Sequence, residues 1–300
     1  LFQRAQFLRS VVVALKRLGS ICSNIRLFSL NGSKQRDITQ QKNFSGMKTL
    51  VRWLLVFVWW ASVIGLMIYT GGHIVEYIFS NLALSEVMKV VYLGFLSLLR
   101  IMVVLLISVV IWVPVGVWIG SRPKLTHLVQ PIAQFLAAFP INLLFPFAAM
   151  LMVRYQLDVN IWCAPLMILG TQWYILFNVI SGASSLPKKL RHAASVFHVK
   201  GFLKWRKLIL PGIFPYLITG VIAAAGGAWN ITFIAEYINF GHTQLAADGI
   251  GAYLARYAAD PHGSAHVVLA LSVMVVYVVL INRLVWRPLY KLSQQRFQLE

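Results

Sequence analysis

The stretch Val90–Ile119 reads VVYLGFLSLLRIMVVLLISVVIWVPVGVWI, and Arg100 is its single charged residue. A transmembrane helix needs about 20 consecutive, mostly apolar residues, so this stretch is long enough to cross a membrane. The chain around it has a similar character: of its 300 residues, 59% are hydrophobic and 12% are charged. Soluble domains are about 45–50% apolar and about 25% charged. The composition therefore excludes an ordinary soluble domain, and it excludes a disordered chain, which requires low hydrophobicity.

Further apolar runs of comparable length lie on both sides of this stretch. Strands of an outer-membrane barrel would show short alternating segments instead of continuous apolar runs. We therefore predict an all-α polytopic membrane protein with about six transmembrane helices. The predicted spans are roughly 51–70, 90–119, 127–153, 161–183, 213–236 and 267–284.

Lysine and arginine are distributed unevenly around these spans. They concentrate in the N-terminal stretch, the loops after the second and fourth spans, and the C-terminal tail. Since basic residues favour the cytoplasmic side, we predict a bacterial inner-membrane protein with both termini and the 184–211 loop in the cytoplasm. The net charge of +19 then reflects membrane topology and does not predict a nucleic-acid partner. The acidic residues that support this topology from the opposite loops are Glu76, Glu86, Asp158, Glu236, Asp248 and Asp260.

The first 46 residues differ from the rest of the chain. Apolar residues recur at helical spacing among basic ones in residues 1–30, which predicts an amphipathic helix on the membrane surface. Residues 31–46 are polar and rich in Gly, Ser, Asn and Gln, so we interpret them as a linker before a transmembrane domain at 47–300. The chain begins with Leu1 instead of Met, and we expect it to be processed or to be part of a longer protein.

Sequence motifs of common enzymes are absent. The chain has no GxxxxGK[ST] phosphate loop, no HExxH and no GxSxG. Its two cysteines, Cys22 and Cys163, form no CxxC pair. His262 and His266 lie four residues apart, but a solvated helix start explains them better than a metal site does. We therefore predict no catalytic, cofactor-binding or metal site in this chain.

The loop at 184–211 reads SSLPKKLRHAASVFHVKGFLKWRKLILP and is both long and strongly basic. Pro187 suits the first turn of a helix, and apolar residues follow it at helical spacing. We expect a second short helix at about 202–208, after Gly201. A short helix outside the membrane is stable only when its apolar face is buried, either on the lipid surface or on a protein partner.

This loop resembles the EAA motif of ATP-binding-cassette importer permeases. The motif reads E-A-A, three residues, Gly, nine residues, an aliphatic residue, any residue and Leu-Pro. Here His192-Ala193-Ala194 is followed at the same spacing by His198 and by Leu208-Ile209-Leu210-Pro211. The flanking stretches 170–184 and 214–238 resemble the nitrate/sulfonate/taurine branch of these permeases, and the resemblance covers roughly residues 85–290.

The chain departs from the motif at two positions. His192 replaces the Glu that helps the loop dock onto the ATPase in the family, and His198 replaces the Gly that makes the turn. A neutral histidine cannot offer a carboxylate to an arginine, and residues other than glycine resist positive φ. We expect Gly201 to take over the turn and coupling to the ATPase to be weaker.

The resemblance implies a type I importer permease fold with a cytoplasmic coupling-helix loop. It implies a permease that forms the path for a small, anionic solute such as nitrate, a sulfonate, taurine, bicarbonate or a pyrimidine precursor. The implied partners are cytoplasmic ATPase subunits carrying ATP and Mg, a periplasmic solute-binding protein, and a second permease module. That module is either a second copy or the other half of a tandem chain, which the missing Met and the basic N-terminal stretch would suit. The residues assigned to ATPase coupling are Leu190, His192, Ala193, Ala194, Phe197, His198, Gly201, Leu210 and Pro211.

Polar side chains within the spans indicate where a path would run, because such groups are costly in lipid and usually face a cavity or another helix. Two features have competing interpretations. Arg100 pairs with an acid, binds an anion, or extends its charge to the membrane surface, and Glu236 is either an interfacial acid or a contact to the solute or to the binding protein. The Gly116–Gly120 GxxxG predicts a tight helix contact. Two alternatives to an importer subunit are a secondary transporter or channel without an ATPase, and a degenerate membrane scaffold. The residues assigned to the translocation path are Asn142, Gln172, Asn178, Trp229, Asn230 and Glu236.

Overall fold

The computed structural model describes residues 38–240 and 243–296. The predicted amphipathic helix at 1–30 and the first part of the predicted linker lie outside the described residues. The chain divides into two compact units, residues 1–70 and 71–300, and each is described by itself.

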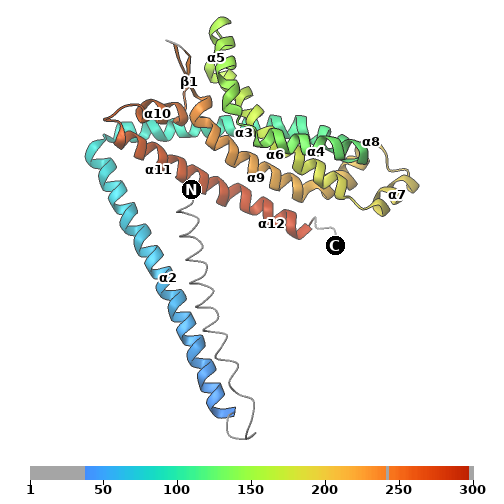
Figure 1. The fold of residues 1–300 in the computed structure, drawn as a ribbon, viewed down its shortest axis with the longest axis horizontal. Coiled ribbons are helices and arrows are strands. Elements are labelled where there is room, and N and C mark those ends of the chain that lie inside the picture. Colours follow the sequence, from blue (N-terminus) through green and yellow to red (C-terminus); the bar gives the residue numbers. More distant parts are fainter. Residues whose placement is uncertain (1–37, 241–242, 297–300) are drawn as a thin grey trace, which may run out of the picture. The chain divides into compact units, whose positions relative to one another are not determined.

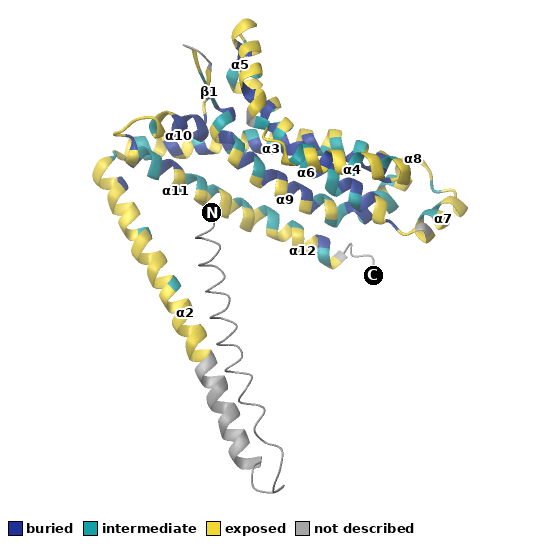
Figure 2. Cartoon of the chain, in the orientation of Figure 1, coloured by how far each residue is buried: buried dark blue, intermediate teal, exposed yellow. Residues whose placement is uncertain are grey.

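Helix α2 (Ile38–Asn81) provides the described part of the first unit and continues into the start of the second. It begins within the predicted linker, so the linker prediction is wrong for residues 38–46, and the predicted boundary at 46/47 falls inside a helix. The reason is that Gln40, Gln41 and Lys42 are good helix formers. From Trp53 to Tyr77 nearly all of its large apolar side chains are exposed, whereas Ile78 near its end is buried (Figure 2). A helix that is apolar on all sides and not buried in protein is suited to lipid.

Long helices form the bundle of the second unit (Figure 1). Helix α6 lies at its centre and makes its most extensive contacts with α9 and α3. Among the described residues, five helices including α2 are long and apolar enough to cross a membrane, which confirms the predicted all-α polytopic class. The long helices of the second unit are α3 (Leu84–Gly120), α6 (Val159–Ser185), α9 (Leu210–Ala235) and α11 (Ser264–Ile281).

The third predicted span is not a single helix. It is divided into α4 (Pro123–Ala138), the 3-10 turn η1 (Ile141–Leu144) and α5 (Phe145–Arg154). The break falls at Phe139, whose backbone is extended with φ −69° and ψ 130°. The following Pro140 explains this, because proline disfavours helical backbone in the residue before it and has no N–H to donate. The six predicted apolar segments thus correspond to five long helices and one broken pair.

Glycines allow close packing around α6. A Cβ added at Gly116 would lie 2.8 Å from Val179 Cγ1, and one at Gly120 would lie 2.6 Å from the carbonyl oxygen of Ile180. Both distances are too short for any larger residue. The GxxxG at 116–120 is therefore a tight contact between α3 and α6, as the sequence predicts.

Short elements lie at the two ends of this bundle (Figure 1). At one end, which we call the α10 end, strands β1 (Tyr237–Phe240) and β2 (Thr243–Ala246) pair antiparallel, and helix α10 (Ile250–Ala258) follows them. At the other end, the α7 end, lie α7 (Lys188–Val196), α8 (Gly201–Lys204) and the π-helical segment η2 (Trp205–Ile209). The π-helical segment η3 (Asn282–Trp286) and α12 (Arg287–Arg296) continue α11 toward that same end.

The predicted second short helix at 202–208 is not a separate element. Segments α8, η2 and α9 run on as one helix from Gly201 to Ala235. No helix breaker stands between Phe202 and Leu210, so nothing in the sequence stops the span from extending outward. The wider π turn of η2 comes just before Pro211, which has no N–H to complete a regular turn.

Candidate functional site

A buried ion pair joins α3 to the end of α9 at the α10 end. The Arg100 guanidinium donates to a carboxylate oxygen of Glu236. The Glu236 side chain has no exposed surface, and that of Arg100 is 11% exposed. Breaking such a pair would leave a buried charge without a partner. Of the interpretations of Arg100, the structure therefore favours pairing with an acid over binding a free anion or extending to the membrane surface.

The same carboxylate is held by uncharged donors from α3 and α10. Ser97 Oγ donates to it at 2.7 Å, and the backbone N–H of Gly251 donates at 2.8 Å. Ser97 Oγ in turn accepts the N–H of Ile250 at 2.9 Å. The first N–H groups of a helix have no partner within the helix and favour negative charge. Glu236 and Ser97 thus cap α10 from outside its own sequence, since its N-cap residue, Gly249, has no side chain.

Two glycines make this capping possible. A Cβ at Gly249 would lie 2.1 Å from Oε2 of Glu236, and a Cβ at Gly251 would lie 2.4 Å from the carbonyl oxygen of Thr232. Sequence reasoning missed Ser97, Gly249 and Gly251. The available signal was the spacing of Ser97 and Arg100, which places both on one face of an apolar helix.

Polar contacts extend this network to α6. Asn160 Oδ1 accepts the Asp248 N–H at 2.7 Å, and Arg100 donates to the Asp248 carbonyl oxygen at 3.3 Å. Tyr253 donates to Glu86 at 3.0 Å and so connects α10 to the start of α3. Burial raises the pKa of Tyr253, and Glu86 raises it further, so the phenol remains a neutral donor. The α10 end is therefore fixed by hydrogen bonds among α3, α6, α9 and α10.

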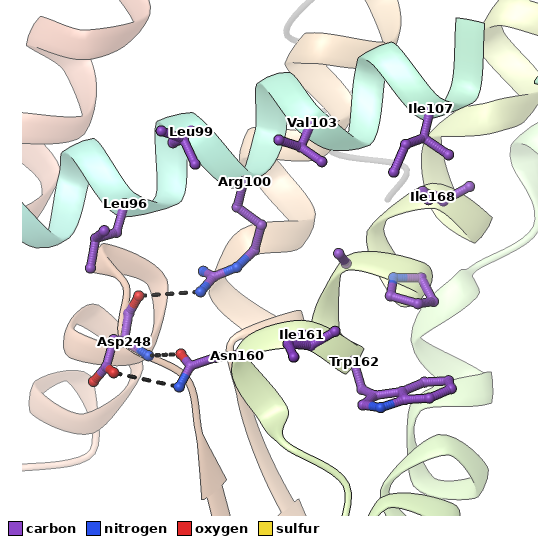
Figure 3. Close-up of a pocket in the computed structure, with 12 residues that line it drawn as sticks. Leu96, Leu99, Arg100, Val103, Ile107, Asn160, Ile161, Trp162, Ile168 and Asp248 are labelled. Atoms are coloured by element: carbon purple, nitrogen blue, oxygen red, sulfur yellow. Dashed lines mark hydrogen bonds between the residues drawn. The ribbon is translucent and has the colours of Figure 1, made fainter. Parts of the chain in front are cut away.

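A cavity of about 670 Å³ opens beside this network (Figure 3). Its polar groups, Arg100, Asn160 and Asp248, gather at one end, and apolar side chains of α3 and α6 form the rest. The Arg100 charge is already neutralised by Glu236, and the exposed Asp248 adds negative charge. The cavity is therefore poorly suited to a small free anion. Its main apolar residues are Leu96, Leu99, Val103, Ile107, Ile161 and Trp162.

The residues predicted to line a path lie mostly along α6 and α9. Gln172 and Trp229 are buried, and Asn230 is exposed. Asn178 is half-buried, and its amide donates to the Tyr174 carbonyl oxygen at 2.7 Å. Its Cβ lies 2.9 Å from a Cβ added at Gly220, so it stands at the α6–α9 contact.

The other two predicted path residues lie apart from this group. Asn142 is in the η1 turn, at the break between α4 and α5. Glu236 is at the end of α9 and belongs to the buried network. The structure thus places Gln172, Asn178, Trp229 and Asn230 on the two most closely packed helices and separates them from Asn142 and Glu236. A role in a path remains a prediction for all six.

The connection between α6 and α9 extends beyond the end of the bundle and carries α7. Leu186 is buried just before it, and the Arg191 guanidinium donates to the Ala183 carbonyl oxygen at the end of α6. These two contacts fix the base of the helix. Pro187 stands at the N-cap, one residue before the first helical turn in which the sequence predicted it. Leu210 and Pro211, also assigned to this loop, form the first turn of α9.

The turn after α7 is made by His198 itself. His198 has φ +54° and forms the turn that ends α7, so Gly201 does not replace it there. Gly201, at the start of α8, also has a positive φ, of +58°. Val199 N–H donates to Ala194 O at 2.9 Å, and His198 N–H donates to Ser195 O at 3.2 Å. This is the hydrogen-bond pattern of a Schellman motif. It gives hydrogen-bond donors to carbonyl groups at the helix end that would otherwise lack them, and it holds His198 in a conformation that glycine adopts more readily.

Large apolar side chains are exposed around this turn. Phe197 is 78% exposed and Phe202 is 80% exposed, while Val196 and Leu203 are more than half exposed. Of the other predicted coupling residues, His192 and Ala193 are exposed and Ala194 is half-buried. We call Val196, Phe197, Phe202 and Leu203 the apolar tip. Val196 and Phe197 stand at the end of α7, and Phe202 and Leu203 lie in the first turn of the helix that runs from Gly201 to Ala235. An exposed apolar cluster of this kind, surrounded by basic residues, marks an interaction surface.

These observations define the class of the protein: a polytopic all-α membrane protein with a tight helical bundle and an extended, amphipathic connection at one end. Residues 112–287 match the family described as "Binding-protein-dependent transport system inner membrane component". Because this region is more than half of the chain, the chain belongs to that family of membrane-spanning permeases.

Several curated proteins are similar to parts of the chain. The bicarbonate transport system permease protein CmpB of Synechococcus elongatus is 27% identical over 165 residues, which are 55% of this chain and 58% of CmpB. The nitrate import permease protein NrtB of the same species is 25% identical over 71% of this chain and 73% of NrtB. The taurine transport system permease protein TauC of Escherichia coli is 26% identical over 47% of this chain and half of TauC. The chain thus spans only about half to three quarters of these relatives.

A solved structure shares the fold. A chain of the MetNI methionine ABC transporter, determined in inward-facing conformations, superposes with a TM-score of 0.55 at 18% sequence identity. The match covers 71% of this chain and 99% of that chain. This likeness confirms the predicted importer-permease fold.

Proposed function

We propose that this chain is the permease subunit of an ATP-binding-cassette importer and forms the membrane path for a small, anionic solute. Family membership and the fold support the permease role. The relatives named for bicarbonate, nitrate and taurine transport support a small solute with an acidic oxygen group. The chain supplies the path, and ATP is hydrolysed by a separate subunit.

The observation that carries this proposal is the apolar tip on the α6–α9 connection. The tip stands at the motif position that the resemblance assigns to ATPase docking, on a helix anchored to the bundle by Leu186 and Arg191. A patch of exposed phenylalanines is stabilised by burial against a partner. Thirteen basic residues lie on the chain segments at the α7 end, and a cytoplasmic position for that end follows from them. Those residues are Arg122, Lys124, Lys188, Lys189, Arg191, Lys200, Lys204, Arg206, Lys207, Arg283, Arg287, Lys291 and Arg296.

The assembly that follows has four kinds of component. Cytoplasmic ATPase subunits, with ATP and Mg, bind the α7 end. A periplasmic solute-binding protein meets the α10 end, where the β1–β2 hairpin and α10 are held by the Arg100–Glu236 network. A second permease module completes the path, either as another copy or as a different chain, in a bacterial inner membrane.

The anionic solute is bound by neutral donors in this proposal. Arg100 is neutralised by Glu236, so it does not offer a free positive charge. Gln172, Asn178 and Asn230 offer amide groups on α6 and α9, and amide N–H groups can bind an oxyanion without holding it as tightly as an arginine would. A solute that must leave again is served by such moderate binding.

The test is the substitution Ala194→Asp, which places a charge on α7 next to the apolar tip. With the ATPase subunit co-expressed, we expect the variant to insert normally but to lose co-purification and solute-dependent ATP hydrolysis. Ala246→Asp is the matched control, because Ala246 is an exposed alanine on β2 at the α10 end. Normal ATPase binding and uptake by Ala194→Asp would favour a secondary transporter or a scaffold instead.

A further inference from the structure

A second cavity, of about 360 Å³, lies near the α7 end of the bundle between α9 and the C-terminal helix. Ile222 of α9 lines one side, and residues of η3 and α12 line the other. Along α11, Asn282 lies 18 residues after Ser264, or about 27 Å at 1.5 Å per residue. That length is close to the thickness of a bilayer's hydrocarbon core, about 30 Å, so Asn282 is expected near one boundary of the apolar layer, with Ile222 on the opposite side of the cavity. The lining residues are Ile222, Asn282, Trp286, Arg287, Tyr290 and Lys291.

The lining of this cavity is positively charged and not neutralised by the described protein. Arg287 and Lys291 are one helical turn apart on α12, so their side chains lie on the same face. Within residues 38–240 and 243–296, neither makes an ion pair with an acidic side chain. The six described acidic residues all lie in segments at the α10 end or in α2. Two cations therefore face one cavity without a counter-charge from the described chain.

Aromatic and amide groups complete the lining. Trp286 and Tyr290 are also one turn apart, and aromatic residues with a polar edge are enriched where a helix passes from hydrocarbon to headgroups. Asn282 and Trp286 mark the two ends of the π-helical segment η3, and such segments occur often at functional sites. The cavity thus combines an aliphatic side chain on α9, two aromatic rings suited to a membrane interface, and two cations on α12.

We propose that this cavity binds an anionic phospholipid from the membrane leaflet at the α7 end of the bundle. The phosphate is held by Arg287 and Lys291, the headgroup edge by Asn282, Trp286 and Tyr290, and the upper part of an acyl chain lies against Ile222. Basic pockets between transmembrane helices recognise lipid headgroups in this way. The site goes beyond the proposed function and does not depend on which solute is carried or on the ATPase.

The experiment compares phosphatidylglycerol with phosphatidylcholine of the same acyl chains, added to the purified full-length chain in detergent. Native mass spectrometry measures bound lipid and its apparent Kd. We expect tighter binding of phosphatidylglycerol, and we expect Arg287→Gln combined with Lys291→Gln to weaken that binding about 30-fold, since each cation near a lipid phosphate contributes about a factor of five. Arg283→Gln is the matched control, because Arg283 is an exposed cation of the same segment that does not line the cavity.

A second measurement does not require the double variant to fold. Brominated phosphatidylglycerol should quench the fluorescence of Trp286, so the unmodified chain should lose more signal than the Trp286→Phe chain. Equal quenching of these two chains, equal binding of phosphatidylcholine, or an equal effect of Arg283→Gln would each overturn the proposal. Displacement of phosphatidylglycerol by excess inorganic phosphate alone would assign the site to a soluble anion and would overturn it as well.

Discussion

Phe197 offers the most direct test of the docking surface at the α7 end. Its side chain is 78% exposed in the described chain, so most of its surface would be removed from water by an ATPase partner. Burying a whole phenylalanine side chain contributes up to about 3 kcal/mol, so burying the exposed part contributes about 2 kcal/mol. We therefore expect Phe197→Ala to raise the Kd for the ATPase subunit about 30-fold.

The measurement is a binding titration of the detergent-solubilised chain with the purified ATPase subunit. Phe147→Ala is the matched control, because Phe147 is 64% exposed on α5. Helix α5 comes before α6 in the chain, and α7 comes after α6. The two phenylalanines therefore lie on either side of α6, whose 27 residues span about 40 Å. Neither change should alter the unfolding temperature of the bundle. An unchanged Kd for Phe197→Ala, or an equal loss of binding by Phe147→Ala, would show that Phe197 does not contact the ATPase subunit.

Three further predictions concern the turn, the buried pair and the topology. His198→Gly should stabilise the α7 turn by about 1 kcal/mol, because glycine adopts positive φ without strain; slower hydrogen exchange of the α7 amides would show this, and faster exchange would contradict it. Glu236→Gln should destabilise the bundle by about 3–5 kcal/mol, since it leaves Arg100 buried without a counter-charge. Adding Arg100→Met should recover most of that loss in denaturant unfolding, and an additive double variant would show that the two side chains do not interact. A cysteine placed at Lys204 should escape membrane-impermeant labelling of intact cells, while one placed at Asp248 should react; the opposite result would reverse the proposed topology.

The class, the long spans and the position of the α7 connection could all be predicted from sequence alone. Continuous apolar runs can be read without tertiary structure, because each must meet lipid or another apolar helix along its whole length. The motif spacing from His192 to Pro211 could be recognised for a similar reason, since local spacing is independent of the rest of the fold. The predictions were wrong where the conformational preference of single residues outweighed the average composition of a segment. Pro140 divides the third apolar run, and α2 begins at Ile38, inside a polar segment.

Which polar groups meet became apparent from the packed helices and not from the sequence. Ser97, Arg100 and Glu236 lie on two helices more than 130 residues apart in sequence, and no periodicity connects them. Their partners on α10 are backbone N–H groups, which carry no sequence signal except that two glycines leave room for the carboxylate. The conformation of His198 also depended on the hydrogen bonds that close the helix end. The physical reason is the same in each case: local patterns fix what a segment can form, whereas the pairing of buried charges depends on distances that exist only after the helices have packed.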